Sequence, residues 1–157
     1  MRDPFVTKNI LKWYDLNKRS LPWRKNVSKE KRQYNTLISE FMLQQTQVAT
    51  VIPYFNKFVK EIPNIKKLAS VDNKKLIKLW EGLGYYSRAR NLKKAAQSVI
   101  KNFNGVIPDN FDDLKSLSGI GDYTANAILA IAFNKPYIPL DGNVERIIKR
   151  YLYLKKE

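Results

Sequence analysis

The sequence contains no cysteine and no histidine among its 157 residues. Without cysteine the chain has no disulfide, no zinc–thiolate site and no ligands for an iron–sulfur cluster. Because histidine is also absent, the usual ligand set for a transition metal is missing. We therefore expect neither a metal nor a cofactor in this chain, and the absence of cysteine agrees with a reducing compartment.

Long hydrophobic runs are absent too. No apolar segment approaches the roughly 18 residues of a membrane-spanning helix, and the first ten residues, MRDPFVTKNI, have no signal-peptide core. Hydrophobic residues nevertheless make up 44% of the chain, which is too many for a disordered segment. We expect a single soluble domain over residues 1–157, monomeric, cytoplasmic and without membrane contact.

Acidic residues are scarce relative to basic ones. The 14 acidic residues face 29 basic ones, giving a formal net charge of +15. Such a surplus favours a polyanionic partner such as nucleic acid. A compositional origin, with Lys, Asn and Ile favoured by AT-rich coding, remains an alternative.

No alternating strand pattern persists for more than a few residues, whereas apolar residues recur at helical period almost throughout. Proline and glycine separate the helical segments, and residues 21–33 are expected to form a basic loop. The sequence therefore predicts an all-α bundle of short helices, over about residues 5–17, 34–45, 47–61, 64–70, 73–81, 86–102, 111–117, 122–133 and 143–153.

The segment LSGIGDYTANA (117–127) joins two of these helices through a pair of glycines. Gly119 and Gly121 permit backbone angles that other residues resist, so the chain can reverse tightly there. The backbone N–H groups at the start of the following helix are then free to bind a phosphate. A plain helix–helix turn is the alternative.

These residues carry a resemblance. LSGIGDYTANAILAIAF (117–133) resembles the helix–hairpin–helix, at about 111–133, of the DNA glycosylase superfamily that includes endonuclease III. LPWR (21–24), SEFMLQQTQVATVIPYF (39–55), LWEGLGYYSRARNLKKAAQ (79–97) and PLDGNVERI (139–147) resemble the A/G-specific adenine DNA glycosylases of the MutY type. The resemblance covers about residues 10–151. It implies the six-helix-barrel part of the HhH-GPD fold, and a bacterial, nucleoid-associated repair enzyme.

The activity implied is hydrolysis of the N-glycosidic bond of adenine opposite 8-oxoguanine or guanine in double-stranded DNA. Such a reaction needs an acid to protonate the leaving base and a carboxylate to stabilise the sugar cation. Glu40 lies on a polar stripe with Thr36, Gln44 and Gln47, which is the pattern of a solvated helix face. By resemblance, Glu40 is the general acid, a role that requires a raised pKa.

Asp141 is the second carboxylate of interest. Asp-Gly is a turn signal, and Asn143 is a natural helix N-cap, so a purely structural role is open. By resemblance Asp141 stabilises the oxocarbenium ion, and Asn143 helps to position the attacking water.

Tyr123 stands at the start of the helix after the hairpin. In endonuclease III-like relatives the matching residue is a lysine whose amine forms a Schiff base, and a phenol cannot do that chemistry. The resemblance therefore implies a monofunctional glycosylase that leaves an abasic site. Packing at a helix start is the alternative.

The resemblance also assigns residues to DNA. It places Gln45 against the opposite purine, Tyr85 as an aromatic wedge in the base stack, and Trp23 and Arg24 in the adenine pocket. Arg88 and Arg90 are expected to contact phosphates, as are the amides around Gly119 and Gly121.

Family members continue with helices that complete the catalytic domain, a four-cysteine iron–sulfur cluster and a Nudix-like domain. None of these follows here, so we expect a truncated catalytic domain in which Trp13 and Tyr14 lack their packing partners. Two alternatives stay open. One is an endonuclease III-like glycosylase/lyase, and the other is a non-catalytic helix–hairpin–helix fragment that binds DNA without cleaving it.

Overall fold

The computed structural model describes residues 4–153, and all the regular secondary structure in this part of the chain is helical. The expectation of an all-α bundle is therefore confirmed. The helices are α1 (Pro4–Asn17), the short 3-10 helix η1 (Pro22–Arg24), α2 (Lys29–Leu43), α3 (Val48–Glu61), α4 (Ile65–Ser70), α5 (Asn73–Trp80), α6 (Ser87–Asn102), α7 (Phe111–Lys115), α8 (Asp122–Phe133) and α9 (Gly142–Tyr151).

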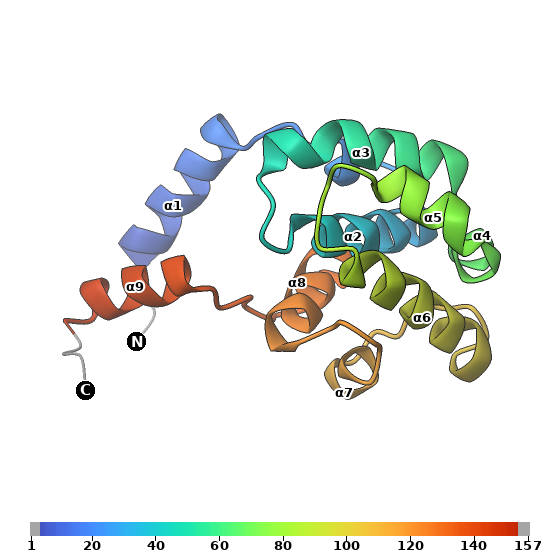
Figure 1. The fold of residues 1–157 in the computed structure, drawn as a ribbon. Coiled ribbons are helices and arrows are strands. Elements are labelled where there is room, and N and C mark those ends of the chain that lie inside the picture. Colours follow the sequence, from blue (N-terminus) through green and yellow to red (C-terminus); the bar gives the residue numbers. More distant parts are fainter. Residues whose placement is uncertain (1–3, 154–157) are drawn as a thin grey trace.

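Helix α2 forms the centre of the bundle (Figure 1). It packs against η1, α3, α6 and α8, and all residues from 33 to 42 are buried. A helix buried on every side lies in the middle of a protein rather than on its surface. Residues 33–42 are therefore surrounded by other elements, and among them Glu40 borders a cleft.

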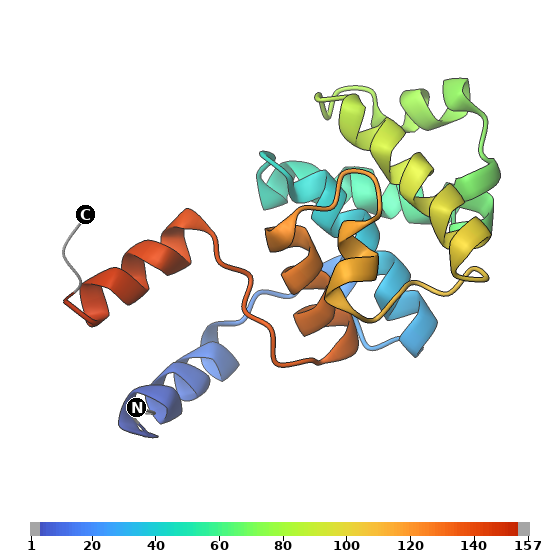
Figure 2. The same cartoon turned by 90° about the horizontal axis from the view of Figure 1, so that it is seen from below.

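The remaining helices surround α2 in two groups (Figure 2). Helices α3, α4, α5 and α6 lie on one side, where α4 packs on α6 and α5 on α3, around the buried aromatic rings of Phe58 and Trp80. Helices α7 and α8 pack on each other on the other side, and α8 also packs on α2. The α2–α3, α5–α6 and α7–α8 connections meet at the C-terminal end of α2, where hydrogen bonds of Arg88 and Gln44 link them.

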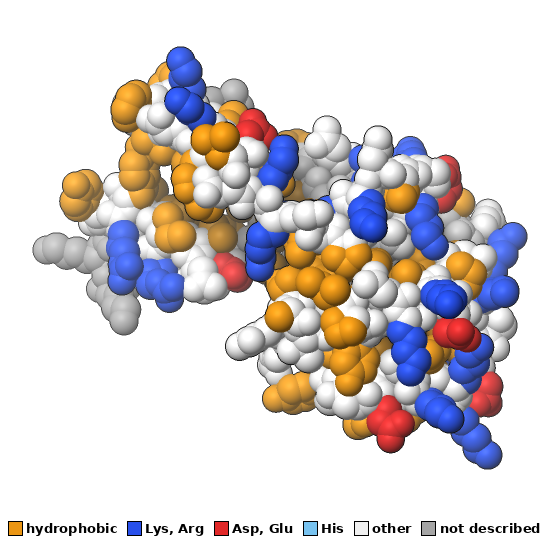
Figure 3. All heavy atoms as spheres, turned by 90° about the horizontal axis from the view of Figure 1, so that it is seen from above, with side chains coloured by type: hydrophobic (Ala, Val, Ile, Leu, Met, Phe, Trp, Pro, Cys, Tyr) orange, Lys and Arg blue, Asp and Glu red, His pale blue; other side chains and the backbone are white. Residues whose placement is uncertain are grey.

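Helices α1 and α9 stand apart from the bundle (Figures 1 and 3). Neither helix has a buried residue. Trp13 is 63% exposed and Tyr14 is 44% exposed. The described helices include none that is both long enough and apolar enough to cross a membrane.

The structure corrects one segment boundary in particular. Residues 21–33 were expected to be a loop, but Pro22–Arg24 form η1 and Lys29 begins α2. Ser28 caps α2 by accepting a hydrogen bond from the Lys31 N–H at 3.3 Å. The charged run after this cap conceals the helical period, because its side chains face solvent.

Candidate active site

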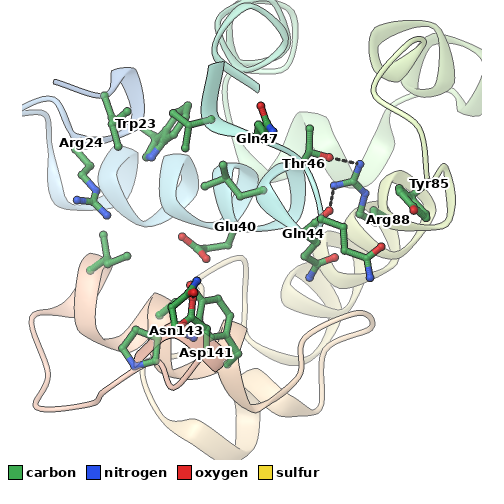
Figure 4. Close-up of a pocket in the computed structure, with 18 of the residues that line it drawn as sticks. Trp23, Arg24, Glu40, Gln44, Thr46, Gln47, Tyr85, Arg88, Asp141 and Asn143 are labelled. Carbon is green, nitrogen blue, oxygen red and sulfur yellow. Dashed lines mark hydrogen bonds between the residues drawn. The ribbon is translucent and has the colours of Figure 1, made fainter. Parts of the chain in front are cut away.

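A cleft of about 1140 Å³ lies between α2 and the segment that joins α8 to α9. Most of the predicted site residues meet there, although they are spread over the whole chain (Figure 4). Those that line it are Trp23, Arg24, Glu40, Gln45, Tyr85, Arg88, Tyr123, Asp141 and Asn143. Gly119, Gly121 and Arg90 do not.

Glu40 projects from the buried half of α2 into the cleft and is only 8% exposed. Its side chain is not part of a solvated helix face, because η1 and α8 cover that side of α2. Burial raises the pKa of the Glu40 carboxyl from 4.5 to about 7, and the charge of Arg24 opposes the rise. At neutral pH a substantial fraction of this carboxyl group is therefore protonated.

Asp141 faces the same cleft from the opposite wall. It caps α9, because Oδ1 accepts hydrogen bonds from the Val144 N–H at 2.8 Å and the Asn143 N–H at 3.0 Å. The hydrogen bond from Val144 is the main cause that lowers the pKa of Asp141. The N-cap is therefore Asp141 and not Asn143, whose side chain instead accepts a hydrogen bond from Arg146 Nη2 at 2.6 Å.

The pKa values of the two carboxyl groups are thus shifted in opposite directions. Glu40 is biased towards the protonated form by burial, while Asp141 is kept ionised by the start of a helix. Carboxyl groups with pKa values pushed apart in one site are the arrangement that supplies an acid and an anion at the same pH.

Tyr123 lines the same cleft from the start of α8 and is 45% exposed. Burial raises the pKa of its phenol, and the negative charges of Glu40 and Asp141 raise it further. The phenol therefore stays protonated at neutral pH and offers the cleft an O–H donor rather than an amine.

Trp23 and Arg24 form one end of the cleft. Trp23 is buried, with its ring packed edge-on against Phe55 at a centroid distance of 5.2 Å, so it is a fixed wall and not a loop side chain. Arg24 is exposed and points towards the cleft (Figure 4).

The hairpin between α7 and α8 uses its two glycines differently. Gly119 has φ +82°, and a Cβ there would meet Asn91 Cβ at 2.8 Å and the Phe41 ring at 2.9 Å. Gly121 has φ −95° and open space where a Cβ would stand. The expectation that both glycines need unusual backbone angles is thus wrong for Gly121, whose missing side chain leaves the start of α8 accessible instead.

Helix α8 begins with free amide donors at this point. Its first intrahelical hydrogen bond runs from the Ala125 N–H to the Gly121 carbonyl at 2.9 Å. The preceding N–H groups have no intrahelical acceptor, and Gly121 leaves room for a phosphate oxygen to reach them.

Gln45 and Tyr85 both line the cleft, from two turns in different parts of the bundle, and Tyr85 lies at its far end from Trp23 (Figure 4). Both side chains are exposed, Tyr85 by 63%. Both residues have positive φ angles, 59° for Gln45 and 47° for Tyr85. A non-glycine residue in this region costs on the order of 1 kcal/mol and persists only where the surroundings fix it.

Arg88 does not lie where we expected it. It is only 6% exposed, and its guanidinium group donates hydrogen bonds to main-chain carbonyls and to one hydroxyl. The expected phosphate contact is therefore wrong for Arg88. Arg90 is exposed on α6, and its contact with phosphate stays a prediction.

Sequence reasoning missed the role of Gln44. Its Nε2 donates a hydrogen bond to the Gly119 carbonyl at 3.2 Å, which joins the end of α2 to the hairpin. Position on the polar stripe of α2 was the only available signal. In the described part of the chain, no group of three or more acidic side chains could hold a metal ion.

An all-helical bundle with a glycine hairpin at a helix start, beside a cleft with two dissimilar carboxyl groups, defines a helix–hairpin–helix protein. The family model "HhH-GPD superfamily base excision DNA repair protein" matches residues 38–157, and the chain belongs to this family.

Relatives and solved structures agree with that assignment. The chain is 46% identical over 145 residues to an adenine DNA glycosylase of Buchnera aphidicola subsp. Baizongia pistaciae, covering 92% of this chain and 40% of the relative. It is 45% identical over 148 residues to the adenine DNA glycosylase of Rattus norvegicus, covering 91% of this chain and 29% of that protein. The structure of a thermostable thymine-DNA glycosylase matches with a TM-score of 0.82 and 27% identity, over 92% of this chain and 65% of that one.

Proposed function

We propose that this chain is an adenine DNA glycosylase that removes adenine opposite 8-oxoguanine or guanine by a monofunctional mechanism. The single observation that carries the proposal is the pair of carboxyl groups in one cleft, with the pKa of Glu40 raised to about 7 and that of Asp141 lowered. Similarity to adenine DNA glycosylases over about nine tenths of the chain supports the choice of base.

Glu40 acts as the general acid. Adenine leaves as a neutral base only if a ring nitrogen is protonated, and by resemblance that atom is N7. A carboxyl group with a pKa near neutral pH combines a usable concentration of the acid with an adequate driving force for proton transfer. Trp23 provides a flat wall for a base turned out of the duplex.

Asp141 stabilises the positive charge that develops on the sugar when the bond breaks. Its ionisation is maintained by the amides of α9, so it remains an anion while Glu40 is an acid. Asn143 lies next to it and offers an amide that can orient the attacking water. The hairpin amides and Arg90 hold phosphates of the strand.

Tyr123 occupies the place where a lyase needs an amine. Its phenol can donate a hydrogen bond to a substrate but forms no Schiff base. The product is therefore an intact strand with an abasic site.

Single-turnover base release tests the proposal, with protein in excess over a duplex holding one adenine opposite 8-oxoguanine. Half of each sample is treated with hot alkali before electrophoresis. Strand cleavage that requires alkali is expected, and Glu40→Gln and Asp141→Asn are each expected to slow it by about 10²–10⁴-fold, with duplex affinity changed less than about threefold. Full activity of either variant would contradict the assignment of roles.

Borohydride treatment of the same mixtures distinguishes the lyase alternative. Only a Schiff base is captured covalently on DNA by borohydride, so the wild-type chain should yield no trapped complex. A trapped complex would favour an endonuclease III-like glycosylase/lyase.

One observation favours a second function, that of a DNA-binding protein without turnover. Asp141 and Asn143 are carried by α9, which buries no residue of its own, so one wall of the cleft is weakly supported. Firm binding that ignores the mispair and falls steeply with salt, without base release, would favour this alternative.

A further inference from the structure

Arg88 is a buried cation with no carboxylate partner in the described part of the chain. It is the second residue of α6. Its Nη1 donates to the carbonyls of Phe41, Met42 and Gln44, and the first two lie at 3.3 and 2.8 Å. Burying a charge is costly unless hydrogen bonds satisfy it, so the acceptors around Arg88 must be held in place by the fold.

The other guanidinium nitrogen extends this set to the turns that hold Gln45 and Tyr85. Nη2 donates a hydrogen bond to Oγ1 of Thr46, the residue after Gln45, at 3.1 Å. It also donates to the carbonyls of Leu83 at 3.1 Å and Gly84 at 3.2 Å, the two residues that precede Tyr85. One planar group therefore binds both turns, each of which holds a non-glycine residue at positive φ (Figure 4).

The same guanidinium group supports the tyrosine ring. Its carbon lies 5.5 Å from the centroid of the Tyr85 ring and 5.6 Å from that of Trp80. Cation–π attraction therefore holds Tyr85 against Arg88, although the ring is 63% exposed. An exposed ring fixed in this way is ready to stack on a base without losing side-chain freedom on binding.

We infer that Arg88 is a positioning residue that joins the Gln45 turn and the Tyr85 turn into one rigid unit, and that this unit discriminates the base opposite the target adenine. The inference rests on the proposed function, because it assigns part of the substrate specificity of the same site. Arg88 acts through Gln45 and Tyr85 and touches no reacting atom.

Only arginine fits this role. The guanidinium group offers donors in a fixed plane and serves six acceptors here. An ammonium group has three donors at a single point. Arg88→Lys therefore keeps the charge but cannot hold both turns at once.

The first test measures the turns without DNA. Amide hydrogen exchange of residues 44–47 and 82–86 is compared for the wild type, Arg88→Lys and Lys101→Met, which removes a charge from an exposed position on the same helix. We expect exchange in both turns to accelerate together by about tenfold in Arg88→Lys and not in Lys101→Met. Acceleration in one turn only, or in neither, would overturn the inference.

The second test measures discrimination. Affinity is determined for duplexes holding 2′-fluoro-2′-deoxyadenosine, which resists base release, opposite either 8-oxoguanine or thymine. We expect Arg88→Lys to reduce the affinity ratio by about tenfold, with affinity for the thymine duplex changed less than twofold. An unchanged ratio together with loosened turns would also overturn the inference.

A double-mutant cycle keeps the inference testable if Arg88→Lys fails to fold. With Arg88 intact, Gln45→Ala and Tyr85→Ala should reduce the ratio non-additively because the turns act as a unit, and additive effects would contradict it. A wild-type chain that binds both duplexes equally would instead contradict the proposed function, and the hydrogen exchange result alone then decides whether Arg88 couples the turns.

Discussion

Glu40 shows how a single residue sets the pH range of the proposed reaction. Its carboxyl group has a pKa of about 7, and only the protonated form can donate to the leaving base. We therefore expect the single-turnover rate to be level below about pH 6, to be halved near pH 7 and to fall tenfold per unit above about pH 8.

The measurement is the rate of base release between pH 5 and 9. Asp141 is held ionised by the α9 amides, so loss of its charge should reduce the rate only below its lowered pKa. A rate that rises through pH 7 would mean that Glu40 works as a base and not as an acid.

The same burial has a cost in stability. The pKa of Glu40 is about 7 in the folded state and near 4.5 in the unfolded state, so the folded state binds more protons between these two pH values. The free energy of unfolding therefore falls by on the order of 3 kcal/mol as the pH rises from 4.5 to about 7. Above about pH 7 this contribution no longer changes. Glu40→Gln, which cannot ionise, should remove this loss.

Urea unfolding at pH 5 and pH 8 checks that expectation. Relative to the wild type, Glu40→Gln should gain stability at pH 8, where the wild type carries a buried charge, and show little gain at pH 5. An equal effect at both pH values would mean that the Glu40 carboxyl group is well solvated in the folded chain.

At the scale of elements, the two glycines of the hairpin before α8 are expected to have different roles. Gly119 should be needed for folding, and Gly121 should be needed for access of a phosphate to the α8 amides. Gly119→Ala would place a Cβ 2.8 Å from Asn91 Cβ at a φ of +82°. We expect it to lower the free energy of unfolding by about 2–4 kcal/mol. Gly121→Ala meets nothing within 4 Å and should change stability by less than about 0.5 kcal/mol.

We expect DNA affinity to be reduced by the Gly121 substitution, which leaves stability almost unchanged. Gly121→Ala should weaken binding several-fold, because the new methyl group crowds the amides at the start of α8. Thermal unfolding and duplex titration on the same two variants make the comparison. If Gly121→Ala binds as tightly as the wild type, those amides do not hold a phosphate.

Local patterns predicted most helices of the fold, because apolar spacing and glycine or proline breaks are written within each segment. They failed at Lys29 to Gln33, where charged side chains conceal the period of α2. They also failed at Arg88. Its acceptors at the end of α2, the carbonyls of Phe41 and Met42, lie more than 40 residues away in sequence. A surface arginine and a buried one look alike until distant carbonyls converge on it.

The candidate site was predicted in a similar way. The residues that gather in the cleft were found through motifs, whereas the pKa of Glu40 depends on burial by η1 and α8, which no single segment encodes. Burial of this kind follows from packing between elements, so the polar stripe of α2 could not distinguish a solvated face from a cleft wall.

At the scale of the whole molecule, basic side chains are spread over both the bundle and the two terminal helices (Figure 3). Large hydrophobic side chains are exposed along α1 and α9, and some are exposed on the bundle as well. The core around α2 is closed without either of these helices. The hydrophobic core that stabilises the fold therefore lies in the bundle from η1 to α8, and α1 adds no buried residue to it.

A variant that begins at Arg19 tests this division. Because α1 has no buried residue, we expect its removal to shift the midpoint of thermal unfolding by less than about 3 °C, which corresponds to about 1 kcal/mol or less. Removal of exposed side chains such as Leu16, at 78% exposure, should also reduce self-association at high concentration. Circular dichroism melting and analytical ultracentrifugation measure the two effects.

Acrylamide quenching of tryptophan fluorescence gives an internal control. Trp13 is 63% exposed, while Trp23 and Trp80 are buried. The variant should therefore lose the accessible fraction of the fluorescence. A fall of the unfolding midpoint by more than about 5 °C would mean that α1 packs on the bundle in solution.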